Sequence, residues 1–155
     1  MSEINWKNKC FVTTIYLVRD DRKVLLSWNK NMNTWIPVGG HLEQGETPEE
    51  AIIREVKEET GFDFEFLDKA EENEDKTIRI IKPLKIQIEK VPHHNYHINF
   101  VFIGKCTNWH ERTENDDNEK LKWFSEQELI NNKKDFLDSV WDVAVLSINK
   151  ARNKA

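Results

Sequence analysis

The chain has 155 residues, which suits one domain with a substantial core and would be cramped for two. Hydrophobic residues make up 38% of it and include six Trp and eight Phe, enough for a globular fold despite 33% charged residues. The net charge of −5 and the lack of a basic patch argue against duplex nucleic acid as a partner, because its phosphates require Lys and Arg.

Cysteine usage and the N-terminal residues bear on location. Cys10 and Cys106 show no metal-ligand spacing and fall in strand-like segments, so we expect buried free thiols. The opening residues MSEINWKNK contain no apolar signal core, and no apolar run approaches membrane-spanning length. We therefore expect no membrane partner and a cytoplasmic location.

Two strand-like segments come first in the chain. Residues 10–18 and 23–28 are rich in β-branched and aromatic side chains. Their near-continuous apolar character predicts strands of a sheet that is covered on both faces. After a polar loop, residues 35–38 lead into the pair Gly39 and Gly40.

Residues 47–60 carry local signals for a helix at both ends. Thr47 suits the N-cap, Pro48 suits the first turn, and Glu50 completes a capping box. Gly61 supplies the left-handed residue that ends a helix. Local chemistry therefore defines both limits of this helix.

One side of the predicted helix is apolar and the neighbouring stripe is acidic. At about 100° per residue, the side expected to be buried carries Ile52, Ile53 and Val56. The acidic stripe holds glutamates three and four residues apart, namely Glu55, Glu58 and Glu59.

Like charges at these spacings repel one another unless a cation is present, and Mg²⁺ prefers carboxylate oxygens. A solvated acidic face is the commoner outcome for an arbitrary helix. This stripe, however, borders the apolar face, follows a Gly-Gly loop and has Arg54 beside Glu55. We therefore favour a metal-binding stripe.

The rest of the chain alternates strands, polar loops and helices. We expect, in order, a short strand over 63–67, a solvated loop over 68–76, a half-exposed strand over 78–91, a strong strand over 96–103, an acidic loop over 108–120 and a strand over 121–124. A short helix begins after Ser125, with Glu128 completing its capping box. A final helix begins near Phe136, because apolar residues recur at helical spacing: Leu137, Val140, Trp141, Ala144 and Ile148. The order predicts a single α/β domain over residues 1–155.

The stretch from Gly40 to Phe62 resembles the Nudix hydrolase signature. That signature is a glycine, five residues, Glu, seven residues, then Arg-Glu-apolar-x-Glu-Glu-x-Gly-apolar. Every specified position is matched, by Gly40, Glu46, Arg54, Glu55, Val56, Glu58, Glu59, Gly61 and Phe62. The resemblance implies an α/β/α sandwich on a mixed β-sheet.

The resemblance also implies roles for the signature residues. Glu55, Glu58 and Glu59 match the family's metal-binding glutamates for Mg²⁺, with Mn²⁺ as a substitute, and Glu58 or Glu59 is also a candidate general base. Arg54 would hold a glutamate in place, and Glu46 would brace the loop.

Two further ligands come from outside the glutamate stripe. A backbone carbonyl at Gly39 or Gly40 is one, because glycine lets the backbone approach closely. Family members often add a glutamate from the loop before a Trp-containing strand, and Glu119 is our candidate over Glu111 and Glu114. Some relatives also take their base from a distant loop, so the base stays open.

Candidate substrate contacts are Gly39, Trp28, Tyr96 and His97. Trp28 and Tyr96 flank the segments that lead to the site, and either could stack on a base. For the cluster His93, His94 and His97 we favour exposed or hydrogen-bonded histidines over a dedicated metal site.

The leading hypothesis is a Mg²⁺-dependent hydrolase that cleaves the pyrophosphate linkage of a small nucleotide, either a nucleoside triphosphate or a nucleoside diphosphate joined to another moiety. A catalytically silent Nudix-like nucleotide sensor is the alternative, and such proteins usually lose signature glutamates. A prenyl diphosphate isomerase and a merely structural metal-bound helix fit less well. Homodimers are common among resembling proteins, so a homodimer is left open.

Overall fold

Strand β1 (Lys9–Val18) runs through the middle of the sheet, as its apolar sequence predicts. The computed structural model describes residues 8–72, 75–92, 95–111 and 120–153. Along its whole length β1 pairs in parallel with β7 (Tyr96–Cys106), from Lys9 opposite Tyr96 to Val18 opposite Lys105. Parallel pairs of this kind are normally buried on both faces.

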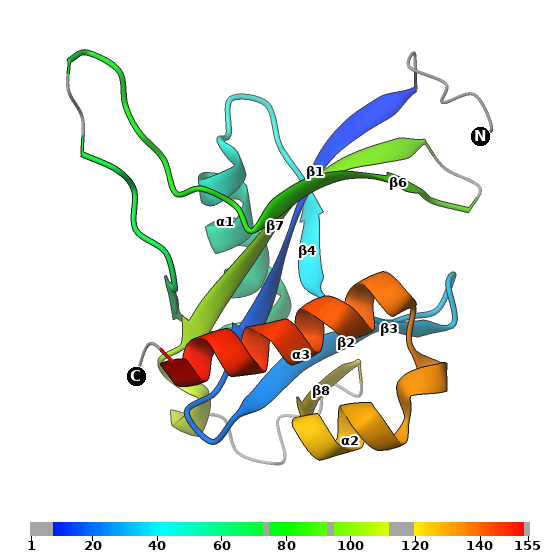
Figure 1. The fold of residues 1–155 in the computed structure, drawn as a ribbon. Helices are drawn as coiled ribbons and strands as arrows, with labels where there is room; N and C mark the ends of the chain where they lie inside the picture. Colours follow the sequence, from blue (N-terminus) through cyan, green and yellow to red (C-terminus); the bar gives the residue numbers. More distant parts are fainter. Residues whose placement is uncertain (1–7, 73–74, 93–94, 112–119, 154–155) are drawn as a thin grey trace.

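The remaining strands add to the two sides of this central pair. The other elements are β2 (Lys23–Asn29), β3 (Thr34–Ile36), β4 (Val38–His41), α1 (Pro48–Thr60), β5 (Phe64–Phe66), β6 (Lys85–Lys90), η1 (Trp109–Glu111), β8 (Leu121–Ser125), α2 (Glu126–Asn131), η2 (Lys133–Asp135) and α3 (Asp138–Asn153). On one side of β1, β4 and β2 pair antiparallel with successive parts of the strand. On the outer side of β7, β6 and β5 do the same. The sheet is therefore mixed (Figure 1).

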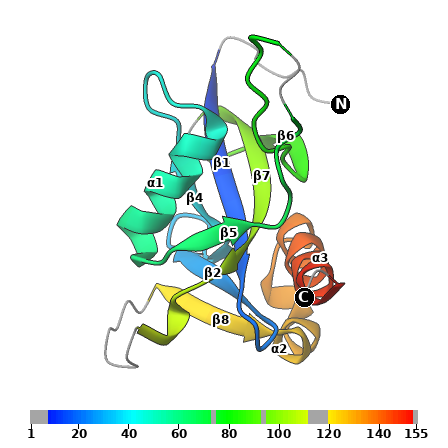
Figure 2. The ribbon, with the colours of Figure 1, turned by 90° about the vertical axis from the view of Figure 1, so that its left-hand side faces the viewer.

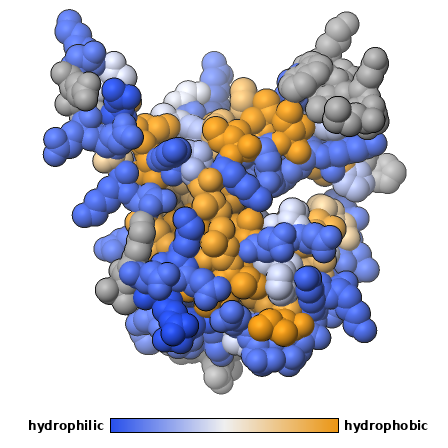
Figure 3. Space-filling view, in the orientation of Figure 1, coloured by the Kyte–Doolittle hydropathy of each residue, from blue (hydrophilic) through white to orange (hydrophobic). Residues whose placement is uncertain are grey.

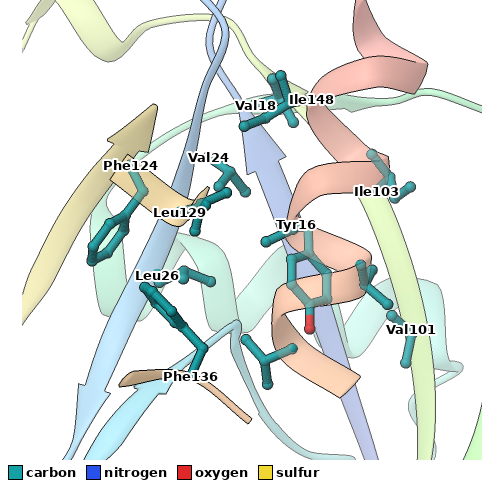
Figure 4. Close-up of a cluster of buried hydrophobic side chains, with 13 residues drawn as sticks. Tyr16, Val18, Val24, Leu26, Val101, Ile103, Phe124, Leu129, Phe136 and Ile148 are labelled. Atoms are coloured by element: carbon teal, nitrogen blue, oxygen red, sulfur yellow. The ribbon is translucent and has the colours of Figure 1, made fainter. Parts of the chain in front are cut away.

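Helices cover both faces of the sheet. Figure 2 shows α1 on one side of the strands and α3 on the other. Alternate residues of β1 feed the two cores: Ile15 and Leu17 pack with Ile52 of α1, whereas Tyr16 and Val18 pack with residues of α2 and α3. Figure 4 shows the second core, in which the β1 and β2 side chains meet those of α3. The α/β/α sandwich predicted from the resemblance is confirmed.

The predicted helix over residues 47–60 is confirmed at both ends. Thr47 accepts a hydrogen bond from the Glu50 amide, and the Glu50 side chain accepts one from the Thr47 amide. Gly61 adopts the left-handed conformation with a φ of 72°. Ser125 and Glu128 form the second predicted capping box, at the start of α2.

The strand predicted over residues 78–91 is wrong in its first half, because only Lys85–Lys90 form a strand. Beyond Ile103, the outer edge of β7 is already paired with β5, so β6 cannot extend further along it. Ile78 is accordingly 78% exposed. The consecutive strands β6 and β7 pair antiparallel, and residues 93–94 between them lie outside the described part of the chain.

Two apolar side chains were assigned to the wrong environment. Ile53 is 50% exposed, because it lies one residue, and hence about 100°, from the buried Ile52. The final helix begins at Asp138, so Leu137 precedes it and is 42% exposed.

Both Cys10 and Cys106 are free thiols as predicted, but only Cys106 is buried and Cys10 is half-buried. No described helix combines the length and apolar character needed to span a bilayer.

Candidate active site

The candidate active site begins where α1 packs against the two glycines of β4. A Cβ atom at Gly39 would lie 2.0 Å from the Thr13 carbonyl oxygen, so β1 and β4 pair closely only because this residue has no side chain. A Cβ atom at Gly40 would lie 2.5 Å from Oε1 of Glu55. The carboxylate of Glu55 therefore occupies the space that a side chain at position 40 would need.

Glu59 lies beside Glu55 in this narrow space. Its carboxylate accepts a hydrogen bond from the Gly39 amide and shares a hydrogen bond with Glu55. Burial, together with the negative charge of Glu55, raises the pKa of Glu59 from 4.5 to about 7. The two carboxylates therefore concentrate negative charge in a half-buried space.

Arg54 fixes the acidic residues from the outer side of α1. Its Nε lies 3.0 Å from both carboxylate oxygens of Glu46, and its Nη1 lies 2.9 Å from Oε1 of Glu55 and 3.1 Å from Oε2 of Glu58. Nη2 donates to the His41 carbonyl oxygen at 3.1 Å. The hydrogen bond from Arg54 lowers the pKa of Glu46, and this contact in turn raises the pKa of Arg54.

These contacts agree with the positioning roles predicted for Arg54 and Glu46. Glu46 also accepts a hydrogen bond from the Glu43 amide at 3.0 Å, so the loop before α1 is tied to the helix. The guanidinium group is planar and always charged, which suits it to hold several carboxylates in fixed directions.

The structure brings two of the three stripe glutamates together and leaves the third at the edge. The Glu55 side chain is 14% exposed, whereas that of Glu58 is 60% exposed and directed to Arg54. The donors at this place are hard oxygens, the kind that Mg²⁺ and Mn²⁺ take. A cation between these adjacent carboxylates would offset the burial and the repulsion from Glu55 that raise the pKa of Glu59, so these residues fit a divalent metal.

The other predicted ligands are less fully described. Gly40 pairs with Thr13 of β1 and lies beside the Glu55 carboxylate, and its role as a metal ligand stays a prediction. Glu119 and Glu114 lie outside the described residues, and Glu111 ends the short helix η1.

A cavity of about 450 Å³ lies on the opposite face of the sheet and extends to the two glycines. It is lined by β1, β4, β6, β7 and the start of α3, through Val12, Thr14, Tyr16, Gly39, Gly40, His41, Gln87, Glu89, His97, Asn99, Leu137, Ser139 and Val140 among others. Figure 3 shows apolar residues in the middle of this face with hydrophilic residues around them. Gly39 and Gly40 line this cavity, and Gly40 also lies against the Glu55 carboxylate of α1, so β4 lies between the cavity and the carboxylates.

A polar network crosses the floor of this cavity. Thr14 Oγ1 donates to Oδ1 of the buried Asn99 at 3.1 Å, and Asn99 Nδ2 donates to Oε2 of Glu89 at 2.9 Å. Gln87 also donates to Glu89. Burial and the nearby Glu89 carboxylate raise the pKa of Tyr16 above its usual range. The cavity is thus apolar with a few fixed polar groups, as ligand sites usually are.

Two of the four predicted substrate residues line the cavity, and the other two do not. Gly39 and His97 line the cavity. Trp28 instead packs edge-to-face on Trp35, with ring centroids 5.3 Å apart, and neither Trp28 nor Tyr96 is among the lining residues.

Sequence reasoning missed Asn99 and Glu89, which carry the polar network of the cavity. The signal for Asn99 was a polar residue within the apolar segment YHINFVFI. Glu89 gave no such signal, because polar and apolar residues alternate along its half-exposed strand.

The fold and this site together define a Nudix-type protein, and comparison with known proteins agrees. The family model described as the NUDIX domain matches residues 10–141. The chain therefore belongs to the Nudix hydrolase family.

Individual relatives differ in how much of their length is matched. A putative 8-oxo-dGTP diphosphatase of Bacillus subtilis (strain 168) is 27% identical over 139 residues, covering 84% of this chain and 82% of that protein. The NAD-capped RNA hydrolase NudC of Vibrio atlanticus (strain LGP32) is 44% identical over 57 residues, which are 36% of this chain and only 21% of that protein. The crystal structure of a NUDIX-family hydrolase from Clostridium perfringens superposes with a TM-score of 0.78 at 30% identity, covering 92% of this chain and 97% of that one.

Proposed function

We propose that this protein is a metal-dependent hydrolase that cleaves the pyrophosphate linkage of a nucleoside diphosphate derivative. The observation that carries the proposal is the Glu55–Glu59 pair, which packs against Gly39 and Gly40 at the edge of the cavity. A cavity of about 450 Å³ with a polar floor suits one nucleoside. Two relatives are named for activities on substrates of this class, a putative 8-oxo-dGTP diphosphatase and an NAD-capped RNA hydrolase.

The side chains and backbone groups of the site would have two roles in hydrolysis, metal binding and proton transfer. Mg²⁺, when bound, neutralises the phosphate oxygens and lowers the pKa of a coordinated water. Glu55, Glu58 and Glu59 would hold the ion, while Arg54 keeps the carboxylates in position through the contacts described above. The Gly39 amide orients Glu59, and the missing side chain at position 40 leaves room for the Glu55 carboxylate beside the strand that borders the cavity.

The chemical step is the attack of water on one phosphorus atom. A new P–O bond forms, the bond from that phosphorus to the bridging oxygen breaks, and the leaving phosphate takes the electron pair. One proton of the water passes to a carboxylate, for which Glu59 and Glu58 are the candidates.

A substrate panel tests this proposal directly. Nucleoside triphosphates, nucleotide sugars, dinucleoside polyphosphates and NAD should be incubated with the full chain, with Mg²⁺ or with EDTA, and the released mono- and diphosphates quantified. We expect turnover of at least one class with Mg²⁺ and none with EDTA, and a loss of about 10²–10⁴-fold in Glu59→Gln. Tight nucleotide binding without any turnover would instead establish the sensor, the alternative function.

A further inference from the structure

Cys10, His41 and His97 form a second cluster of metal-binding side chains, separate from the glutamates. One ligand atom from each residue lies within 4.8 Å of the other two. The imidazole rings of His41 and His97 meet edge-to-face, with centroids 5.0 Å apart and planes at 85°. The cluster therefore gathers one sulfur and two nitrogen donors at a single point.

The register of three strands brings these residues together from distant parts of the sequence. Cys10 of β1 lies directly opposite His97 of β7, so their side chains share one face of the sheet. His41 of β4 lies opposite Val12, two residues along β1 from Cys10 and therefore on the same face. His41 and His97 both line the cavity, and the cluster consequently lies at its rim.

We propose that Cys10, His41 and His97 form a binding site for a thiophilic divalent ion, Zn²⁺. Thiolate sulfur and imidazole nitrogen are the preferred donors of Zn²⁺, and three protein ligands leave the fourth tetrahedral position to water or to a ligand. A tetrahedral ion would bring these donor atoms to about 3.3–3.6 Å from one another. Because the present separations are within 4.8 Å, small side-chain rotations are enough.

The surroundings of the cluster suit a cation. Cys10 Sγ donates to the Tyr96 carbonyl at 3.9 Å, a long contact that the thiol gives up when it loses its proton to solvent and binds the ion. His41 is exposed, which opens a path for the ion. Glu89 lies opposite His97 in β6, and its carboxylate adds negative charge to the same face.

This site is chemically distinct from the carboxylate pair. Mg²⁺ takes oxygen donors, and sulfur and nitrogen donors select zinc-like ions. The two sites are nevertheless adjacent, because the His41 carbonyl accepts a hydrogen bond from Arg54.

The test uses Co²⁺ as a spectroscopic substitute for Zn²⁺, with excess Mg²⁺ present to occupy the carboxylates. In the full-length protein we expect one equivalent of Co²⁺ to give thiolate-to-cobalt charge-transfer absorption and the intense visible bands of tetrahedral cobalt. Cys10→Ala should abolish the charge-transfer band, whereas His41→Ala and His97→Gln should weaken Co²⁺ binding at least about tenfold.

Matched controls separate this site from the other thiol, the other histidines and the catalytic centre. Cys106→Ala, His110→Gln and Glu59→Gln should all keep the charge-transfer band. The proposal is overturned if the wild-type protein shows no such band, or if His41→Ala and His97→Gln both develop the band at the same Co²⁺ concentration as the wild type.

Thermal stability gives a second readout that is independent of activity. At a hundredfold excess over its dissociation constant, Zn²⁺ should raise the wild-type Tm by about 5–10 °C. The exposed His41 can be replaced with little cost to folding, so a folded His41→Ala protein that shows the same Zn²⁺-dependent rise would refute the site.

Discussion

Replacement of Glu59 by Gln should make the metal-free protein more stable while it removes activity. The substitution keeps the shape of the side chain and replaces a carboxyl group, whose pKa burial and Glu55 raise to about 7, with a neutral amide. A site that favours a cation is unfavourable for the folded protein when the cation is absent. Removing this unfavourable charge should therefore raise stability and abolish activity together.

The magnitude follows from linkage between folding and protonation. The pKa of Glu59 is higher in the folded than in the unfolded protein. Glu59 therefore does not lower the free energy of unfolding below about pH 4.5, and this free energy falls as the pH rises through 7. The full shift corresponds to about 3 kcal/mol at pH 8. Because Glu59 is only half-buried, solvent screening reduces this to about 2 kcal/mol, or roughly 4–8 °C in Tm.

Urea denaturation in EDTA at pH 5 and pH 8 measures this effect. Glu59→Gln should exceed the wild type by about 2 kcal/mol at pH 8 but by only about 0.5 kcal/mol at pH 5, where Glu59 is still protonated in the folded protein. Glu65→Gln removes an exposed carboxylate outside the site and is the control. Its free energy of unfolding should differ from that of the wild type by the same amount at both pH values. The same difference in free energy of unfolding between Glu59→Gln and the wild type at pH 5 and at pH 8 would refute this prediction.

Three further predictions concern the glycines, the arginine and the cavity. Gly40→Ala should lower Mg²⁺ affinity and turnover at least about tenfold with little loss of Tm, because the new Cβ meets only the movable carboxylate of Glu55. Gly39→Ala should instead lower the free energy of unfolding by about 2–4 kcal/mol in urea denaturation, because its Cβ meets the backbone of β1. Arg54→Lys should lower turnover about 10–100-fold in the Mg²⁺-dependent assay, since one ammonium cannot hold three carboxylates, and a wild-type rate would contradict its role. Glu89→Gln should raise the KM for nucleotides several-fold with kcat nearly unchanged in steady-state assays, and a change in kcat alone would argue against a binding role.

The parts of the fold that depend on local chemistry could be predicted from the sequence. The limits of α1 follow from a capping box and a left-handed glycine, each decided by residues within one turn. The contact between Arg54 and Glu58 also follows from a spacing of four residues along one helix, whereas the role of Arg54 is what the family resemblance implies. The failed predictions depend on contacts between distant residues. The first half of the segment 78–91 has strand-like residues, yet β5 already occupies the edge of β7 that it would need.

The cavity could not be predicted for a similar reason. Its floor is a row of side chains on one face of three strands, and only the pairing register decides that Asn99 meets Glu89 and Thr14. Trp28 looked available for stacking on a base in the sequence, but the pairing of β2 with β3 turns it toward Trp35.

Strand β1 links the two metal sites through its alternation. Its odd-numbered residues face α1 and the carboxylates, and its even-numbered residues face the cavity and the cysteine–histidine cluster. A slip of one residue would exchange these faces, so the register that buries Ile15 against Ile52 also directs Cys10 toward His97. Because the two donor sets differ in hardness and lie on opposite faces, each can be filled without the other. An ion at Cys10, His41 and His97 would then add positive charge at the rim of the cavity that a nucleotide diphosphate must enter, and turnover should depend on Zn²⁺ separately from Mg²⁺.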